Sequence, residues 1–380
     1  MCLTFLRTAL LVVGIALLFP ACQSGTDDQG SAGASIADNT VQVTSDDQVS
    51  FTVQVEGLRL RAGAGPEAQV IRTLTRGELL IDGREVSDFT TPIRLRGIDF
   101  DEPWIKVHTT DGETGWVYGG ALNPAMQASP EAASLLLDKR LTTFFGESLT
   151  RKIQDYRDQY AVAKTSDQLA AVYLDGANIS AQMNPVLEER ITVEDYDQLP
   201  DLFWLEQAFP AYQPTLVAEG TIYYLFADYR DWLEKARLTQ GTEDDDFVAI
   251  ALDLFPQDSI AHFYPAYFLQ TWDYGGHSLL GRGIHLDLLT RLEEAWQGGE
   301  SAFAPAIRNM TRGIVEDITN VDNTYWEGQT AIAGELKSIL DRDWDVLTTE
   351  DEIALRARTQ QFAEPKKHQI SLDNGSGMGG

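Results

Sequence analysis

Between residues 51 and 125, apolar and polar side chains alternate with the period of two that is typical of half-buried strands. Phe51 and Val53 are separated by a polar residue, and a second alternating segment covers 104–118. In that segment Asp111-Gly112 lies between two strands, and this dipeptide favours a tight hairpin turn. Several short strands within one small region predict a small all-β barrel over these residues.

After residue 125 the apolar side chains recur every three to four positions, which is the period of amphipathic helices. Ser129-Pro130 supplies a helix cap and a proline suited to the first turn, and Gly146 supplies a stop. The repeated pattern predicts an all-α domain of about ten helices over 126–365. Residues 366–380 end in a Gly-rich segment, which predicts a disordered tail. The predicted fold class is therefore multi-domain, a small β barrel followed by a larger all-α domain.

The first part of the chain has the composition of a secretion signal. Arg7 precedes an uninterrupted apolar run over 9–19, which is too short to span a bilayer as a helix. The run is followed by Ala21-Cys22, and this junction resembles the lipobox of bacterial lipoproteins, whose cysteine is lipidated and becomes the mature N-terminus. The resemblance implies a signal peptide over 1–21 and a lipid anchor at Cys22. The alternative is an ordinary signal peptide that is cleaved near Ala21.

Residues 22–50 are rich in small and polar side chains and lack aromatic ones, which predicts a flexible linker. The chain has two cysteines, Cys2 and Cys22, and the first lies in the segment that would be removed. The mature protein would therefore have neither a disulfide nor a catalytic thiol, which excludes thiol peptidases and amidases.

The charge is strongly negative, with 58 acidic against 29 basic side chains and a net charge of −29. A nucleic-acid partner is therefore excluded, because such proteins carry a basic surface. The excess is uneven: 51–125 holds 11 acidic and 8 basic residues, a net of −3, whereas 126–365 holds 41 and 18, a net of −23. No phosphate-loop or dinucleotide motif occurs, so no cofactor is expected.

Three motifs between 51 and 125 occur in the order and spacing of one known family. They are the run Leu58-Arg59-Leu60-Arg61-Ala62-Gly63, then Gly77, and then a group made of Trp104, Val107, Gly112, Gly115, Trp116 and Val117. In these residues the chain resembles the bacterial SH3 (SH3b) family. It departs from the family at Ala64, where proline is usual, and over 85–102, where the connection is longer and carries Arg94 and Arg96.

The resemblance implies an SH3-like barrel that binds cell-wall peptides or protein segments in the envelope. Aromatic rings along a shallow groove suit extended peptides, and the candidates here are Trp104, Trp116 and Tyr118. Arg61 is the candidate partner for a carboxylate. Alternation places Trp104 on the face opposite Ile105, so we predict that Trp104 is the exposed ring and that Trp116 belongs to the core.

A second candidate site lies between two predicted helices, at 271–285, where glycine, aromatic, histidine and charged residues gather. Loops of this composition often bind a ligand. The alternative is a helix that ends at glycine and is followed by a structural turn. The candidate ligand-binding residues are Trp272, Asp273, Tyr274, His277, Arg282 and His285.

Catalytic and metal-binding chemistry would need residues that the sequence supplies sparsely. Glu147-Ser148 resembles the Glu-Ser pair of lytic transglycosylases, but the motif that follows it in that family is missing, and Glu147 also suits a helix start. His262, His277 and His285 are candidate metal ligands, yet their spacing matches no standard zinc site. We therefore predict no metal and no catalytic residue.

Together these features predict a lipid-anchored protein of the bacterial cell envelope, on the outer membrane and facing the periplasm or the cell surface. The outer membrane is favoured because glutamine rather than aspartate follows Cys22, as in lipoprotein sorting patterns. The protein would be a non-catalytic scaffold that binds peptidoglycan or an envelope protein. The alternative function is that of a helical, lysozyme-like cell-wall hydrolase with a carboxylate as the acid.

Overall fold

A computed structural model describes residues 49–193, 195–217, 220–256, 264–271 and 275–372. The predicted signal peptide, the lipidation site at Cys22 and most of the predicted linker lie outside these ranges. Within them, none of the helices combines the length and the apolar composition that a membrane span requires.

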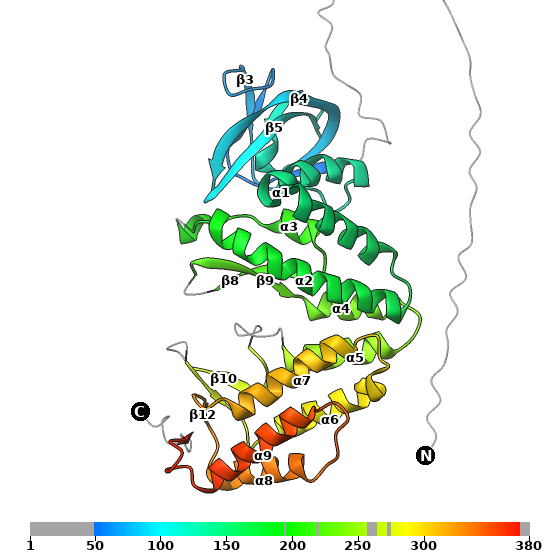
Figure 1. The fold of residues 1–380 in the computed structure, drawn as a ribbon. Helices are drawn as coiled ribbons and strands as arrows, with labels where there is room; N and C mark the ends of the chain where they lie inside the picture. Colours follow the sequence, from blue (N-terminus) through cyan, green and yellow to red (C-terminus); the bar gives the residue numbers. More distant parts are fainter. Residues whose placement is uncertain (1–48, 194, 218–219, 257–263, 272–274, 373–380) are drawn as a thin grey trace, which may run out of the picture. The chain divides into compact units, whose positions relative to one another are not determined.

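The N-terminal strands form one antiparallel sheet of seven strands in the order β3-β2-β6-β5-β4-β1-β7. Figure 1 labels β3, β4 and β5 of this sheet. Strands β3 and β7 form its two edges, so the sheet is open and the predicted closed SH3-like barrel is wrong. The strand bounds are β1 Val49–Val53, β2 Leu58–Arg61, β3 Val70–Leu74, β4 Leu79–Leu95, β5 Ile98–Thr109, β6 Thr114–Tyr118 and β7 Leu122–Pro124.

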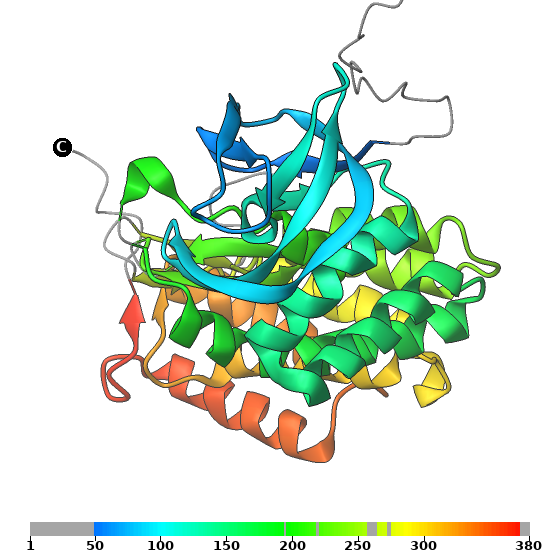
Figure 2. The same ribbon diagram turned by 90° about the horizontal axis from the view of Figure 1, so that it is seen from above.

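The main departure from a small barrel is the length of β4 and β5, which span 17 and 12 residues. The sequence predicts a long connection over 85–102. In the structure this segment belongs to β4 and β5, which pair with each other up to Leu95 and Ile98. Figure 2 shows that both strands are strongly curved. The predicted hairpin of 104–118 is confirmed, because β5 and β6 pair from Trp104–Tyr118 to His108–Thr114.

Nine α-helices follow in the described part of the chain, but the prediction of an all-α domain is wrong because two small sheets lie among them. The helices are α1 Pro130–Val162, α2 Ser166–Arg190, α3 Phe203–Ala208, α4 Tyr229–Ala236, α5 Glu243–Leu254, α6 Ile284–Trp296, α7 Ala304–Thr319, α8 Gln329–Leu340 and α9 Thr349–Ala363. Ser129 caps α1 by accepting a hydrogen bond from the N–H of Ala132, as predicted, and α1 kinks at Gly146, where φ is +75°.

The first small sheet is the hairpin of β8 (Tyr212–Val217) and β9 (Ile222–Ala227), which lies against α2. In β9 Tyr223 and Leu225 are buried and Tyr224 is exposed, which is the alternation of a strand. The second small sheet has the order β10-β11-β12-β13, with bounds Phe268–Gln270, Gly276–Ser278, Thr324–Tyr325 and Ser371–Leu372. Strand β13 belongs to the predicted tail, so the first residues of that tail are ordered.

A buried ion pair fastens α1 to the large sheet. The Arg140 Nε of α1 lies 3.3 Å from the Glu102 Oε1 of β5, and both side chains are almost fully buried. The Arg140 Nη2 also donates to the carbonyl oxygens of Gly119 and Leu122, at 3.0 and 3.1 Å. Burial raises the pKa of Glu102, and the charge of Arg140 lowers it in part. Removing either partner would leave an unpaired charge in the interior.

Candidate functional site

A cavity of about 600 Å³ opens on the large sheet and contains three of the four residues predicted for the groove, Arg61, Trp104 and Tyr118. The sheet contributes residues of β2 and the end of β4, and the loop after α2 contributes one side chain. The lining residues are Val55, Glu56, Gly57, Leu58, Arg59, Arg61, Ile93, Arg94, Leu95, Arg96, Trp104, Tyr118, Ala121 and Gln198. This volume suits a small ligand or one segment of a larger one.

The aromatic residues of the cavity are fixed by hydrogen bonds. The Trp104 indole Nε1 donates to the Thr91 Oγ1 at 2.9 Å, and the Tyr118 hydroxyl donates to the Thr91 carbonyl oxygen at 2.7 Å. The two rings contact each other, with centroids 5.8 Å apart. Burial raises the pKa of Tyr118, so its hydroxyl remains a neutral donor.

The prediction that Trp104 is the exposed ring is wrong, because only 3% of this residue is exposed. Alternation fails here because the four residues from Glu102 to Ile105 are all buried, which means that both faces of β5 are covered. Trp116, predicted as core, is partly buried and packs against the core from a position outside the lining of this cavity.

Arg61 is the most unusual residue of the cavity. It is 8% exposed, its Nη1 donates to the Ala68 carbonyl oxygen at 2.7 Å, and its guanidinium lies 5.8 Å from the centre of the Trp104 ring. Its Nε is buried and has no hydrogen-bond partner. Among the residues that the structure describes, no carboxylate forms an ion pair with Arg61. A buried cation is normally paired with an anion or surrounded by acceptors, and Arg61 has a single acceptor, so its guanidinium favours an additional anionic partner.

Three more arginines surround the cavity, and they make it a positive region in a strongly acidic protein. Arg59 and Arg94 are exposed and Arg96 is half-buried. Arg94 is paired with Asp99 at 2.8 Å. The one acidic lining residue is Glu56, whose Oε2 accepts a hydrogen bond from the Arg76 N–H. The lining therefore carries an excess of positive charge, which favours an anionic ligand.

The tip of the β4–β5 hairpin places Arg94 and Arg96 at the cavity. Arg96 and Gly97 both have positive φ, +48° and +81°, which is the conformation of a two-residue type I′ turn. The Gly97 carbonyl oxygen accepts a hydrogen bond from the Thr192 N–H at 3.1 Å. A Cβ at Gly97 would lie 1.8 Å from the Thr192 carbonyl oxygen, so only glycine fits. Gly97 at the second central position is the sequence signal of this turn.

The second candidate site is organised as a structural turn in its described part. Trp272, Asp273 and Tyr274 lie outside the described residues. Arg282 is paired with Glu327 at 2.7 Å. The N–H groups that open α6 are held by the Glu335 carboxylate, which accepts from Gly281, Gly283 and Leu286 at 2.5, 2.9 and 3.0 Å. The N-terminus of α6 is therefore capped by Glu335, a side chain of α8 that is distant in sequence.

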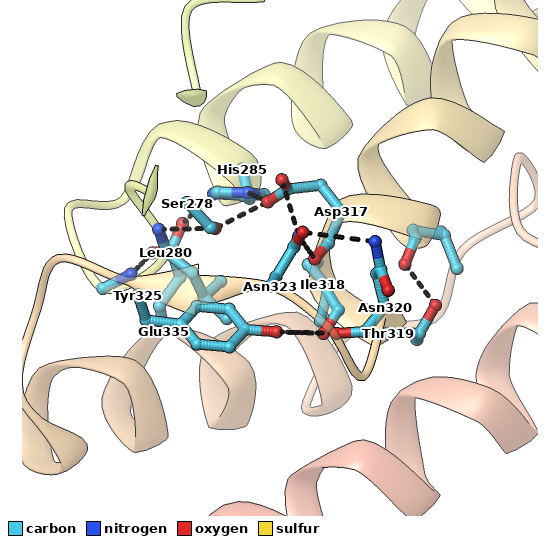
Figure 3. Close-up of polar contacts among 12 residues, drawn as sticks. Ser278, Leu280, His285, Asp317, Ile318, Thr319, Asn320, Asn323, Tyr325 and Glu335 are labelled. Carbon is cyan, nitrogen blue, oxygen red and sulfur yellow. Dashed lines mark hydrogen bonds and ion pairs between the residues drawn. The ribbon is translucent and has the colours of Figure 1, made fainter. Parts of the chain in front are cut away.

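His285 belongs to a buried polar network. Figure 3 shows His285 and Ser278 both directed at Asp317. The Asp317 Oδ2 accepts from the Ser278 hydroxyl at 2.6 Å and lies 2.8 Å from the His285 Nε2, and Asn323 donates to Oδ1 at 3.1 Å. His285 and Ser278 have no exposed surface, so neither can meet a ligand. The network joins β11, α6 and α7.

The remaining candidates do not form a recognisable centre. His277 lies in β11 and His262 lies outside the described residues, and within the described ones no group of three ligand-type side chains could hold a metal ion. Glu147 is exposed on α1, immediately after the kink at Gly146. The arginine-lined cavity is therefore the strongest candidate site of the described structure.

Comparisons of the chain with protein-family models, with curated proteins and with solved structures each found no match.

Proposed function

We propose that the protein is a lipid-anchored component of a bacterial cell envelope that binds peptidoglycan through the arginine-lined cavity of its large sheet. The observation that carries the proposal is the meeting of Arg61, Trp104 and Tyr118 in one cavity. They are three of the four groove residues that the sequence predicts. The lipobox-like junction at Ala21-Cys22 supports the envelope location.

The chemistry of the cavity suits peptidoglycan, which combines sugar rings with peptides that bear carboxylates. Guanidinium groups bind carboxylates through paired, charge-assisted hydrogen bonds, and a buried aromatic surface packs against apolar groups. The residues from 51 to 125 are nearly balanced in charge, whereas the helices carry most of the negative excess. The sheet is consequently the part of the chain that can approach an anionic polymer at the lowest electrostatic cost.

Binding is favoured over hydrolysis for this cavity. Glycoside hydrolysis ordinarily requires two carboxylates on either side of the scissile bond. Among the described lining residues, Glu56 is the single acid. The cavity thus has the charge pattern of an anion-binding site and not that of a glycosidase.

Co-sedimentation with purified peptidoglycan sacculi tests the proposal. The wild-type chain should bind saturably, and Arg59→Glu combined with Arg96→Glu should weaken binding by about tenfold or more, because both charges at the rim are reversed. Arg84→Glu is the matched control: Arg84 is exposed on β4 and does not line the cavity, so binding should be unchanged. The absence of saturable binding by the wild type would contradict the proposal.

Cys22→Ser should move the protein from the membrane fraction to the soluble fraction of a bacterial host. The serine cannot be acylated, and two or more acyl chains are what hold a lipoprotein in a bilayer. Fractionation followed by immunoblotting measures the change. Cys2→Ser, in the segment expected to be removed, should leave the protein in the membrane fraction. Membrane retention of Cys22→Ser would refute a lipid anchor at this position.

A further inference from the structure

We infer that the cavity recognises a free carboxylate of a peptide, that the Arg61 guanidinium binds this carboxylate, and that Arg59 and Arg96 interact with further negative charge at the rim. The inference rests on the proposed function and names the chemical group that the cavity recognises. It predicts that the peptide part of peptidoglycan, and not its neutral sugar, determines affinity.

The other buried arginines of the described structure have more acceptors than Arg61 has. Arg140 has the Glu102 carboxylate and two carbonyl oxygens as acceptors for its Nε and Nη2, and its buried Nη1 has no partner. Arg358 donates to the carbonyl oxygens of Ile318 and Asn320 and to two side chains. Arg61 has one acceptor, the Ala68 carbonyl oxygen, and its buried Nε has none.

The position of Arg61 explains why its partner would come from outside the chain. It lines an open cavity, whereas Arg140 is enclosed between α1 and the sheet. A carboxylate bound to the part of the guanidinium that faces the cavity would supply the negative charge that Arg61 lacks. Guanidinium and carboxylate groups match each other as planar, two-pronged partners.

The surroundings of Arg61 favour a carboxylate on an amino-acid residue over a phosphate. The apolar side chains of Leu58 and Ile93 and the Trp104 ring line the same cavity. The carbon that bears the terminal carboxylate of a peptide also carries a side chain, and an apolar one could pack on these residues. A phosphate is more highly charged and more strongly hydrated and has no such neighbour. We therefore commit to the peptide carboxylate and treat phosphate as an alternative to be tested.

Isothermal titration calorimetry with soluble muropeptides released from purified sacculi tests the inference. Three probes are compared: the muropeptides with free carboxylates, the same muropeptides after conversion of the carboxylates to amides, and inorganic phosphate. The free acids should bind the wild type, and the amides should bind at least about tenfold more weakly, because a charged hydrogen bond is lost. Phosphate should neither bind nor compete at similar concentrations.

Two variants place the effect at Arg61. Arg61→Gln should weaken binding of the free acids by about tenfold or more while leaving the weak binding of the amides unchanged. Its melting temperature without ligand should be equal to or higher than that of the wild type, because the variant removes an unpaired buried charge. Arg61→Lys keeps the positive charge but loses the planar guanidinium. Its affinity for the free acids should therefore lie between that of the wild type and that of Arg61→Gln. Arg84→Gln is the control and should match the wild type.

The possible failures are distinguishable. If no muropeptide binds the wild type, the proposed function fails and the inference fails with it. If free acids and amides bind equally well, the proposed function stands and the carboxylate inference is overturned. If phosphate competes as strongly as the free acids, the peptide source is overturned. The comparison of probes uses the wild-type chain alone, so it does not depend on whether a variant folds.

Discussion

Arg140→Leu should lower the free energy of unfolding by about 3–5 kcal/mol at neutral pH, the range found when one partner of a buried ion pair is removed. The substitution leaves the Glu102 carboxylate buried in the sheet without its counter-ion and removes one of the donors to each of the Gly119 and Leu122 carbonyl oxygens. Because this pair fastens α1 to the sheet, the effect is expected in global urea unfolding.

The loss should depend on pH in a defined direction. Burial raises the pKa of Glu102 and Arg140 lowers it, so removing Arg140 raises the folded-state pKa further above its unfolded value. A raised carboxyl pKa favours the folded state at low pH, and this contribution is lost as the pH rises through the folded-state value. The difference between variant and wild type should therefore be smallest at acidic pH, where Glu102 is protonated in both proteins, and should grow as the pH rises.

Arg157→Leu is the matched control for Arg140→Leu. Arg157 lies on the same helix and is paired with Asp138 at 3.5 Å, but both side chains are partly exposed. Exposed pairs contribute about 0–1 kcal/mol, so this variant should resemble the wild type. The double variant Glu102→Leu with Arg140→Leu should recover much of the loss, because it leaves no unpaired charge. Equal stability of the two single arginine variants would contradict the assignment.

Asp317→Ala should also lower the free energy of unfolding, by about 3–5 kcal/mol. The Asp317 carboxylate accepts from Ser278, His285 and Asn323, and the substitution leaves the buried Ser278 and His285 without this acceptor, whereas Asn323 keeps the Asp317 carbonyl oxygen. Each unsatisfied buried donor costs about 1–3 kcal/mol. Chemical unfolding followed by circular dichroism measures the change.

Asp322→Ala provides the comparison for Asp317→Ala. Asp317 lies in the last turn of α7, and Asp322 lies in the loop that follows this helix, with its side chain exposed. Its removal should change stability by less than about 0.5 kcal/mol. A loss at Asp317 no larger than that at Asp322 would mean that the network of Figure 3 does not stabilise the fold.

Sequence patterns correctly predicted elements that depend on neighbouring residues. They led to wrong predictions for elements that depend on contacts between residues distant in the sequence. The hairpin of 104–118 and the cap at Ser129 follow from neighbouring residues alone, and both are confirmed. The closed barrel was wrong because the pairing of Leu95 with Ile98 extends two strands through a segment that differs from the family pattern. The hairpin of β8 and β9 was missed because the whole of 126–365 was predicted to be helical, although Tyr224 and Leu225 point to opposite faces.

The candidate site shows the same division. The sequence singled out Arg61, Trp104 and Tyr118, which the structure brings together. The sequence did not reveal that Trp104 is buried. Both faces of β5 are covered at this point, so the alternation of buried and exposed residues that the prediction assumed is absent. Gln198 was missed, since only the fold brings the loop after α2 to the cavity. The Arg140–Glu102 pair spans 38 positions and leaves no sequence signal.

Nuclear magnetic resonance with ¹⁵N-labelled protein tests the central claim most directly, because it reports the Nε–H of arginine and of tryptophan separately. On titration with soluble muropeptides, the Arg61 Nε–H and the Trp104 indole Nε1–H should shift together and saturate, since Arg61 gains an acceptor beside the Trp104 ring. The indole signal of the buried Trp232, far from the cavity in the aromatic core of the helices, should stay in place. Saturable binding that shifts signals of the helices and leaves Arg61 and Trp104 unchanged would contradict the account.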